Sequence, residues 1–390
     1  MKQFDFHFPT QVYLGVGRIK ELGARCKEKG TKAFVVYDPF LKDSPLVENI
    51  REDLNKNGVS YLEYYDVVPN PRNTSVDEGV ELCKKENCEM VIVVGGGSAI
   101  DTAKAIALVA VNGGNCWDYT ERADEYVRRP QMKGLPLIAA PTTAGTGSEA
   151  TCGAVINNPA KKRKATIIHR FLYPDVSIID PELTVTLPAH ITALTGLDTF
   201  AHAFEAYICK AANPVSDLLA ESSIKYFAES IRDAVKDGTN LEARSGMAMS
   251  CALGGLAIFH AGVVLPHAIG QPLSALTDAP HGGTLAACIP QIIEWTVPYA
   301  QDRFAKVAEI LDGERVKDMS EEKKAVELPK ILHDLYQDID VNVSFSGYGL
   351  TEDNIEELVD MSYTAFIQDI NGHPKPVTRE DVVQIVKNCM

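Results

Sequence analysis

Two patterns of hydrophobic positions divide the chain. In the first half, short runs rich in β-branched and aromatic residues alternate with polar stretches, and the runs cover residues 32–38, 59–67, 90–97, 135–143 and 176–180. Strands that alternate with helices predict a parallel sheet covered by helices. From residue 183 onward helical patterns dominate, as in residues 190–210, 214–235, 241–257 and 352–367.

The change of pattern predicts a domain boundary. Residues 180–188, DPELTVTLP, combine two prolines with a helix-start pattern. A chain of 390 residues and 42.5 kDa also exceeds what one hydrophobic core usually serves. We therefore expect an α/β domain over residues 1–183 and an all-helical domain over residues 184–390.

Composition narrows the class of protein. With 45% hydrophobic and 23% charged residues and a mean hydropathy of −0.07, the chain is expected to fold in water and not in a membrane. The net charge of −15 makes nucleic acid a poor partner. Nine cysteines without a CxxC pair predict reduced thiols and not a disulfide framework. Because Asp5 and His7 interrupt the start where a signal peptide needs an apolar run, we expect a cytoplasmic protein.

A glycine turn is the first candidate for binding chemistry. Gly95, Gly96, Gly97 and Ser98 follow an apolar strand and precede a helix. Free backbone amides and the helix dipole make such a turn an anion site. The dinucleotide fingerprint GxGxxG is incomplete, because Ile100 occupies the third glycine position. A tight turn without a ligand therefore remains an alternative.

Asp38 ends the strand at residues 32–38, at the sheet edge where ligands of open α/β folds bind. Its carboxylate is suited to a ribose diol and would repel a 2′-phosphate, which favours NAD over NADP. Alternatively, Asp38 has no ligand and only caps the turn before Pro39. Residues 141–151, PTTAGTGSEAT, supply hydroxyls and glycines suited to a phosphate or a nicotinamide amide, or form only a loop.

A second cluster has metal-ligating chemistry. Four of the nine histidines lie between His202 and His281, and Asp198 and His202 stand at i and i+4 on an otherwise apolar helix face. With His267 and His281, they provide one carboxylate and three imidazoles, which suit iron or zinc better than magnesium or calcium. An Asp/His pair at this spacing is alternatively a surface hydrogen bond. His260 is either a further cleft residue or a satisfied core histidine.

Six ordered motifs resemble the iron-containing, group III alcohol dehydrogenases over essentially the whole chain. They are LGVGRIKELG at residues 14–23, VPNP at 68–71, GGGSAIDTAK at 95–104, PTTAGTGSE at 141–149, the segment at 177–205, and PHAIGQPLSALTDAPHG at 266–282. The resemblance implies a Rossmann-like nucleotide-binding N-terminal domain and an all-helical metal-binding C-terminal domain, with the cleft between them. It also implies an enzyme.

The resemblance carries over a set of site residues. A divalent metal, most often iron and sometimes zinc, would be held by Asp198, His202, His267 and His281. The residues assigned to NAD binding are Asp38, Asn70, Gly95, Gly96, Gly97, Ser98, Asp101, Thr142, Thr143, Thr146, Val155 and Lys164. We also expect a homo-oligomer, a dimer or larger.

Two departures from the family pattern affect the chemistry. Many members place a histidine credited with proton relay four residues after the third ligand, where this chain has Gln271. A glutamine cannot titrate, so the proton would pass through His260, the cofactor ribose or water. The stretch AGVVLP before His267 also differs from the usual AGLGLV, so the substrate cannot be inferred from the family.

The sequence thus predicts a metal-dependent, NAD-linked oxidoreductase that interconverts a primary alcohol or small polyol with its aldehyde or ketone by hydride transfer. The basic run at residues 161–164 raises the alternative of an anionic carboxy- or sulfo-aldehyde as substrate, although such a run is usually a solvated turn. The same two-domain plan also resembles polyol and glycerol-phosphate dehydrogenases and, more distantly, a metal- and NAD-dependent cyclising synthase. A non-catalytic sensor of NAD and metal is a further alternative, which Gln271 permits.

Overall fold

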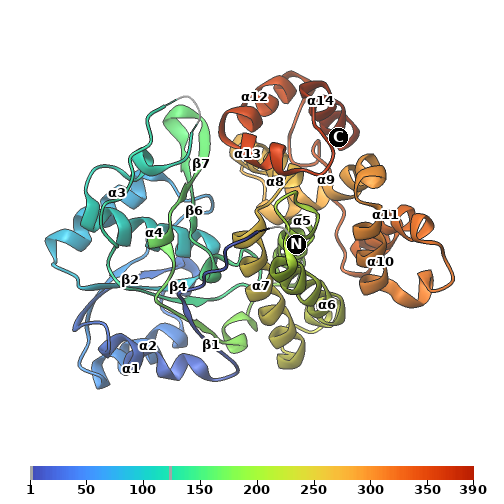
Figure 1. The fold of residues 1–390 in the computed structure, drawn as a ribbon. Helices are drawn as coiled ribbons and strands as arrows, with labels where there is room; N and C mark the ends of the chain where they lie inside the picture. Colours follow the sequence, from blue (N-terminus) through green and yellow to red (C-terminus); the bar gives the residue numbers. More distant parts are fainter. Residues whose placement is uncertain (1–2, 123–124) are drawn as a thin grey trace. The chain divides into compact units, whose positions relative to one another are not determined.

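The computed structural model describes residues 3–122 and 125–390, and the chain divides into two compact units (Figure 1). The sheet unit comprises Phe8–Thr143 and Ser148–Thr184. The helical unit comprises Val185–Met390, the short segment Ala144–Gly147 and the described residues up to His7. The division at Thr184 lies one residue from the expected domain boundary, and the segment at residues 144–147 was not expected in the helical unit.

The sheet unit is built on six parallel strands. Their order is β1 (Gln11–Leu14), β8 (Val176–Ile179), β5 (Leu137–Pro141), β4 (Met90–Gly95), β2 (Lys32–Tyr37) and β3 (Ser60–Tyr64). Its α-helices are α1 (Leu22–Lys27), α2 (Pro45–Lys56), α3 (Asn73–Lys85) and α4 (Gly97–Asn112). Strands β4 and β5 are buried at every position, which explains their continuous apolar sequence. The predicted α/β fold is confirmed.

The strand order places a reversal beside β2. Strand β3 pairs with one edge of β2, and the next strand, β4, pairs with the other edge. The direction in which strands are added to the sheet therefore reverses at β2. In open parallel sheets the crevice at such a reversal, at the carboxyl ends of the strands, is where ligands bind. The carboxyl ends of β2 and β4 are followed directly by Asp38 and Gly96.

Two features of the sheet unit were not predicted. The edge strand β1 has a half-exposed, partly polar sequence, so it lacks the apolar run of the inner strands. The antiparallel hairpin of β6 (Gly153–Asn158) and β7 (Arg163–Ile168) mixes polar and apolar residues, and its turn passes through Lys162 at φ 50°.

The second half of the chain is all helical, as predicted. Its helices are α5 (Ala189–Ile208), α6 (Pro214–Lys236), α7 (Leu241–Ala261), α8 (Leu265–Thr277), α9 (His281–Thr296), α10 (Gln301–Val316), α11 (Glu321–Asp338), α12 (Ile355–Ala365), α13 (Ile367–Gly372) and α14 (Arg379–Asn388). The central helix α5 is buried along nearly all of its second half, and its Phe200 and Phe204 pack against Phe227 and Phe304 of neighbouring helices. This packing makes α5 a rigid support for polar side chains on its remaining face.

All nine cysteines are free and buried, in agreement with reduced thiols. Within the described residues, no single helix is long and apolar enough to cross a membrane, and α7 and α8 meet that length and composition only as a pair bent by 108°.

Candidate metal centre and nucleotide site

Three helices supply the predicted metal ligands. Helix α5 carries Asp198 and His202 one turn apart, and both side chains are buried. His267 is the third residue of α8, directly after Pro266, and His281 is the first residue of α9. Two helix starts therefore direct imidazoles toward one face of α5.

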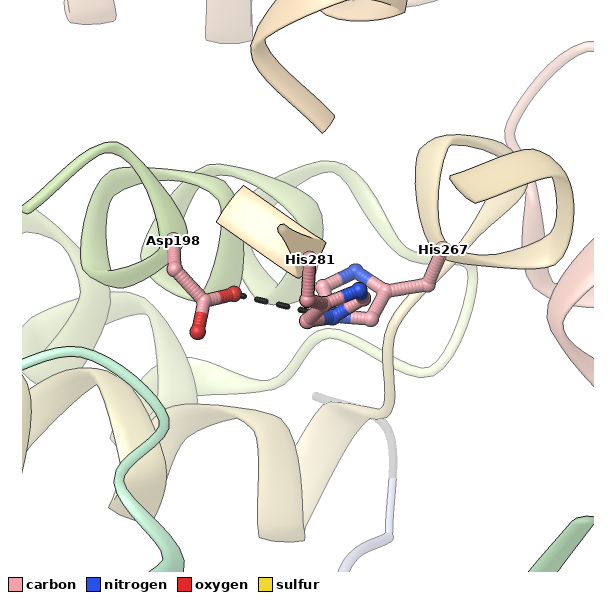
Figure 2. Close-up of side chains that lie close together, drawn as sticks. All are labelled: Asp198, His267 and His281. Carbon is pink, nitrogen blue, oxygen red and sulfur yellow. Dashed lines mark ion pairs between the residues drawn. The ribbon is translucent and has the colours of Figure 1, made fainter. Parts of the chain in front are cut away.

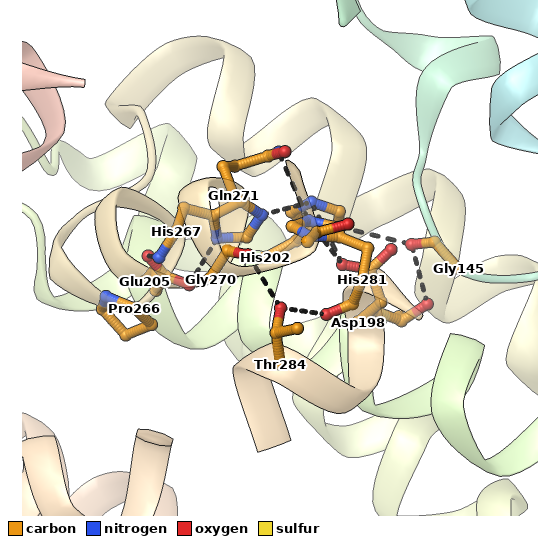
Figure 3. A network of polar contacts seen from close by, with 12 residues as sticks. Gly145, Asp198, His202, Glu205, Pro266, His267, Gly270, Gln271, His281 and Thr284 are labelled. Atoms are coloured by element: carbon orange, nitrogen blue, oxygen red, sulfur yellow. Dashed lines mark hydrogen bonds and ion pairs between the residues drawn. The ribbon is translucent and has the colours of Figure 1, made fainter. Parts of the chain in front are cut away.

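The four side chains form one cluster. Ligand atoms of Asp198, His267 and His281 all lie within 4.8 Å of one another (Figure 2). Nε2 of His202 lies 3.2 Å from Nε2 of His267 and 3.7 Å from Oδ1 of Asp198 (Figure 3). Residues separated by as many as 83 positions in the sequence thus converge on a common point.

Contacts behind the rings orient two of the imidazoles. Nδ1 of His202 lies 3.3 Å from the carbonyl oxygen of Gly145, and Nδ1 of His267 lies 2.6 Å from Oε1 of Glu205. These contacts turn both Nε2 atoms toward the cluster, which is the usual arrangement of metal-binding histidines. The segment at residues 144–147 reaches α5 because the Thr199 hydroxyl bonds the carbonyls of Ala144 and Gly145, each at 3.2 Å.

The donor set fits a divalent metal. Oδ1 of Asp198 is buried and accepts no hydrogen bond from any residue that the structure describes, although buried carboxylate oxygens require a partner. For two nitrogens bound tetrahedrally at about 2.1 Å, the separation is about 3.4 Å, close to the 3.2 Å between His202 and His267. Burial also lowers the pKa of His202, which favours the neutral ligand form. One carboxylate and three imidazoles suit iron or zinc.

Glu205 supports the cluster from behind the ring of His267, although sequence reasoning gave it no role. It is fully buried, and its Oε2 accepts the backbone N–H groups of Val264 at 2.7 Å and His267 at 3.3 Å. Burial raises the pKa of Glu205 to about 8, and the N–H of Val264 opposes that shift. A signal existed, because Asp198, His202 and Glu205 follow each other at spacings of four and three on one helix face.

The two residues considered for proton transfer differ in their surroundings. Gln271 is 7% exposed, and its Nε2 lies 3.4 Å from Nε2 of His281. His260 stacks on Phe6 with ring centroids 4.3 Å apart and contacts Phe259 edge-on. Among the described residues, its contacts include none of the four residues of the metal cluster.

In the sheet unit, the glycine turn lies at the strand reversal. Oδ2 of Asp38 accepts the backbone N–H of Gly96 at 2.5 Å, and α4 begins at Gly97 with its first amides facing away from the helix. A Cβ at Gly95 would lie 2.6 Å from Cβ of Ala99 and 2.8 Å from Oδ2 of Asp38, so only glycine fits there. Burial raises the pKa of Asp38, and the N–H of Gly96 opposes this shift. The turn has the features of an anion site.

The other residues assigned to NAD have varied partners. Nζ of Lys164 donates to Oδ1 of Asn70 at 3.0 Å. Asp101 accepts hydrogen bonds from the Ser148 hydroxyl at 2.6 Å and from the backbone N–H of Val155 at 2.9 Å.

Thr142 and Thr143 follow β5 and lie beside the glycine turn, since the N–H of Thr142 donates to the carbonyl of Gly95 and Thr143 is the side chain nearest a Cβ at Gly96. Thr146 belongs to the helical unit. In the basic run, Lys161 pairs with Glu125 at 2.7 Å, at the turn of the β6–β7 hairpin.

A parallel sheet with a glycine turn at its strand reversal, and a helical unit with one carboxylate and three imidazoles close together, are the features expected of a two-domain dehydrogenase. The chain belongs to the iron-containing alcohol dehydrogenase family. The family described as "Iron-containing alcohol dehydrogenase" matches residues 9–181, and "Fe-containing alcohol dehydrogenase family, C-terminal" matches residues 192–390. The resemblance inferred from the six motifs is confirmed.

Relatives cover the full chain. An NAD-dependent methanol dehydrogenase from Bacillus methanolicus is 35% identical over 99% of this chain and 100% of its own length. A choline dehydrogenase from Bacillus subtilis is 37% identical, with 100% and 96% of the two chains covered. The crystal structure of a 1,3-propanediol oxidoreductase superposes with a TM-score of 0.93 at 32% identity, covering 100% of both chains. The relatives are oxidoreductases, so the enzyme prediction is confirmed.

Proposed function

We propose that this chain is a metal-dependent, NAD-linked oxidoreductase that interconverts a primary alcohol or small polyol with its aldehyde or ketone. The observation that carries the proposal is the convergence of Asp198, His202, His267 and His281, with the buried Oδ1 of Asp198 lacking a hydrogen-bond donor among the described residues. The family relationship and the NAD-dependent methanol dehydrogenase relative support the same reaction class.

When bound, the metal would polarise the substrate oxygen and NAD would exchange the hydride. The chain's own residues hold and orient these groups. The carbonyl of Gly145 and the carboxylate of Glu205 fix the imidazoles of His202 and His267 from behind. Such support keeps ligands in their productive geometry when the substrate changes charge.

The sheet unit supports the cofactor part of the proposal. The free amides at the start of α4 suit a pyrophosphate, and Asp38 lies beside them through its bond to Gly96. A carboxylate at this position favours the ribose diol of NAD and disfavours the 2′-phosphate of NADP. We infer NAD as the cofactor and Fe²⁺ as the first metal to test, with Zn²⁺ as the second.

The test is NADH oxidation, followed at 340 nm, by protein loaded with Fe²⁺ or with Zn²⁺. A panel of butanal, other short aldehydes and a carboxy- or sulfo-aldehyde covers both the main proposal and the anionic alternative. Activity with neutral aldehydes that Asp198→Asn abolishes is the expected result. No NADH oxidation with any aldehyde and either metal would refute the proposed function, and a strong preference for the charged aldehyde would favour the alternative.

A further inference from the structure

Gln271 places a buried carboxamide at the edge of the metal cluster. It lies on α8, four residues after His267, and it is 7% exposed. Its Nε2 lies 3.4 Å from Nε2 of His281, and Figure 3 shows the amide reaching toward that ring. Its Oε1 is buried and accepts no hydrogen bond from any residue in the described ranges.

An acceptor of this kind is costly. Leaving a buried carbonyl oxygen without a donor destabilises the folded protein, and an apolar side chain of similar length would avoid that cost. Such a group beside a candidate active site indicates that its partner comes from a ligand. Because the oxygen and nitrogen of a carboxamide are about 2.2 Å apart, Oε1 lies within about 5.6 Å of Nε2 of His281.

Metal binding would release the other end of the same amide. A cation at Nε2 of His281 takes the lone pair to which the amide of Gln271 now points. The Nε2 donor and the Oε1 acceptor of Gln271 would then both be without a hydrogen-bond partner among the four metal-binding side chains. Because a carboxamide does not exchange protons near neutral pH, its role is to orient a ligand and not to transfer a proton.

We propose that Gln271 is a specificity-determining residue that hydrogen-bonds a second hydroxyl of the substrate, so that the enzyme favours small diols over the matching simple alcohols. This inference rests on the proposed function. A site that hydrogen-bonds a substrate hydroxyl disfavours the analogue without it, because the protein group is then left unpaired. The amide lies beside His281, so it is placed to meet a hydroxyl on a substrate held at the cluster.

The experiment compares 1,3-propanediol and 1,2-propanediol with 1-propanol. In metal-loaded wild-type protein, kcat/KM is expected to be at least tenfold higher for a diol than for 1-propanol. Gln271→Met, which keeps length and removes both hydrogen-bonding groups, is expected to lower kcat/KM for the diol at least tenfold and to change that for 1-propanol less than threefold. Gln291→Met on α9 is the matched control and should change neither.

A binding measurement separates this inference from the proposed function. Co²⁺-loaded protein without NAD is titrated with each alcohol, so that no hydride acceptor is present, and the visible absorption of Co²⁺ gives the Kd without turnover. Weaker binding of the diol alone in Gln271→Met supports the inference even if no alcohol is oxidised, a result that would refute only the proposed function. Equal losses for the diol and for 1-propanol, or a wild-type preference for 1-propanol, would overturn it.

Discussion

The carboxylate of Glu205 lies 2.6 Å from Nδ1 of His267 and accepts the backbone N–H groups of Val264 and His267 through its other oxygen. A single buried side chain therefore holds both the ring of a candidate metal ligand and the first turn of the helix that carries it. Loss of the carboxylate would affect the direction of the ring as well as the position of α8.

Glu205→Gln is expected to weaken metal binding by about 10–100-fold, as changes in the partner of a metal-binding histidine typically do. The amide oxygen of glutamine can still face Nδ1 of His267, but its NH₂ group then opposes the backbone N–H groups that Oε2 accepts. The Kd for Co²⁺ or Zn²⁺, from absorption or calorimetry, tests this. Glu221→Gln is the control, because Glu221 on α6 accepts a hydrogen bond from the hydroxyl of Tyr207 on α5. Equal affinities in the two variants would contradict the prediction.

Metal is expected to stabilise the protein. At a free metal concentration 100 times Kd, binding contributes about 2.7 kcal/mol, which corresponds to a rise in Tm of roughly 5–10 °C for a domain of this size. Scanning calorimetry with Zn²⁺ and with a chelator measures the shift. The shift should be absent in Asp198→Asn, because the imidazole cluster then lacks its only carboxylate ligand. A full shift in that variant would mean that the metal binds elsewhere.

The sequence predicted the parts of the site that depend on local patterns. Asp198 and His202 are recognisable because their spacing places both on one face of an apolar helix. Four of the five predicted strands, β2, β4, β5 and β8, are recognisable because nearly all of their residues are buried, whereas the edge strand β3 is only partly buried. In contrast, the carbonyl of Gly145 lies 57 positions from His202, and Glu205 lies 62 positions from His267. No local pattern links residues so far apart, and a backbone carbonyl has no sequence signature.

The absence of a local sequence pattern also explains why β1, the β6–β7 hairpin and the contact between Asp38 and Gly96 were not predicted. The edge strand β1 is half-exposed, so no hydrophobic alternation separates it from a loop. The hairpin turn at Lys162 uses a left-handed backbone without glycine or asparagine, the usual signs of such a turn. The contact between Asp38 and Gly96 depends on the pairing of β2 with β4, which a hydrophobic pattern alone does not determine.

Gly282→Ala is expected to weaken metal binding and stability. A Cβ at Gly282 would overlap the carbonyl oxygen of Leu194 and lie 3.3 Å from Cβ of Asp198, so α9 must move away from α5 and carry His281 with it. Overpacking of this kind costs about 1–3 kcal/mol. Gly313→Ala is the matched control, because no atom lies within 4 Å of a Cβ there. Urea unfolding and Zn²⁺ titration of both variants test the prediction, which an unchanged Kd in Gly282→Ala would refute.

Asp38→Gly is expected to relax the choice of cofactor. The variant removes the negative charge beside the first turn of α4, so repulsion of a 2′-phosphate decreases. The ratio of kcat/KM for NADPH to that for NADH should rise at least tenfold, and Asp43→Gly in the following loop should leave the ratio unchanged. The side chain of Asp38 makes no capping hydrogen bond to the turn at Pro39 and bonds Gly96 instead. If Asp38 only holds the glycine turn in place, both cofactors will lose activity equally.

His373 is expected to make stability depend on pH below neutrality. Its side chain is fully buried, Nε2 lies 2.9 Å from the Thr296 hydroxyl, and the ring stacks on Trp295. Burial, with smaller contributions from Lys210 and Lys375, lowers the pKa of His373 from 6.5 to about 3. Above pH 6.5 both the folded and the unfolded chain carry a neutral ring, so no stability is lost there. Below it only the unfolded chain binds the proton.

The free energy of unfolding should therefore fall by about 1.4 kcal/mol per pH unit from this group between about pH 6 and pH 4. Urea unfolding at pH 7, 6 and 5 measures the slope for the wild type and for His373→Asn, which keeps a polar group near Thr296 but does not titrate. Below pH 6 the free energy of unfolding of the wild type should fall more steeply than that of the variant, by about 1.4 kcal/mol per pH unit. Parallel slopes would show that the folded protein also protonates His373, which a fully buried ring near two lysines should resist.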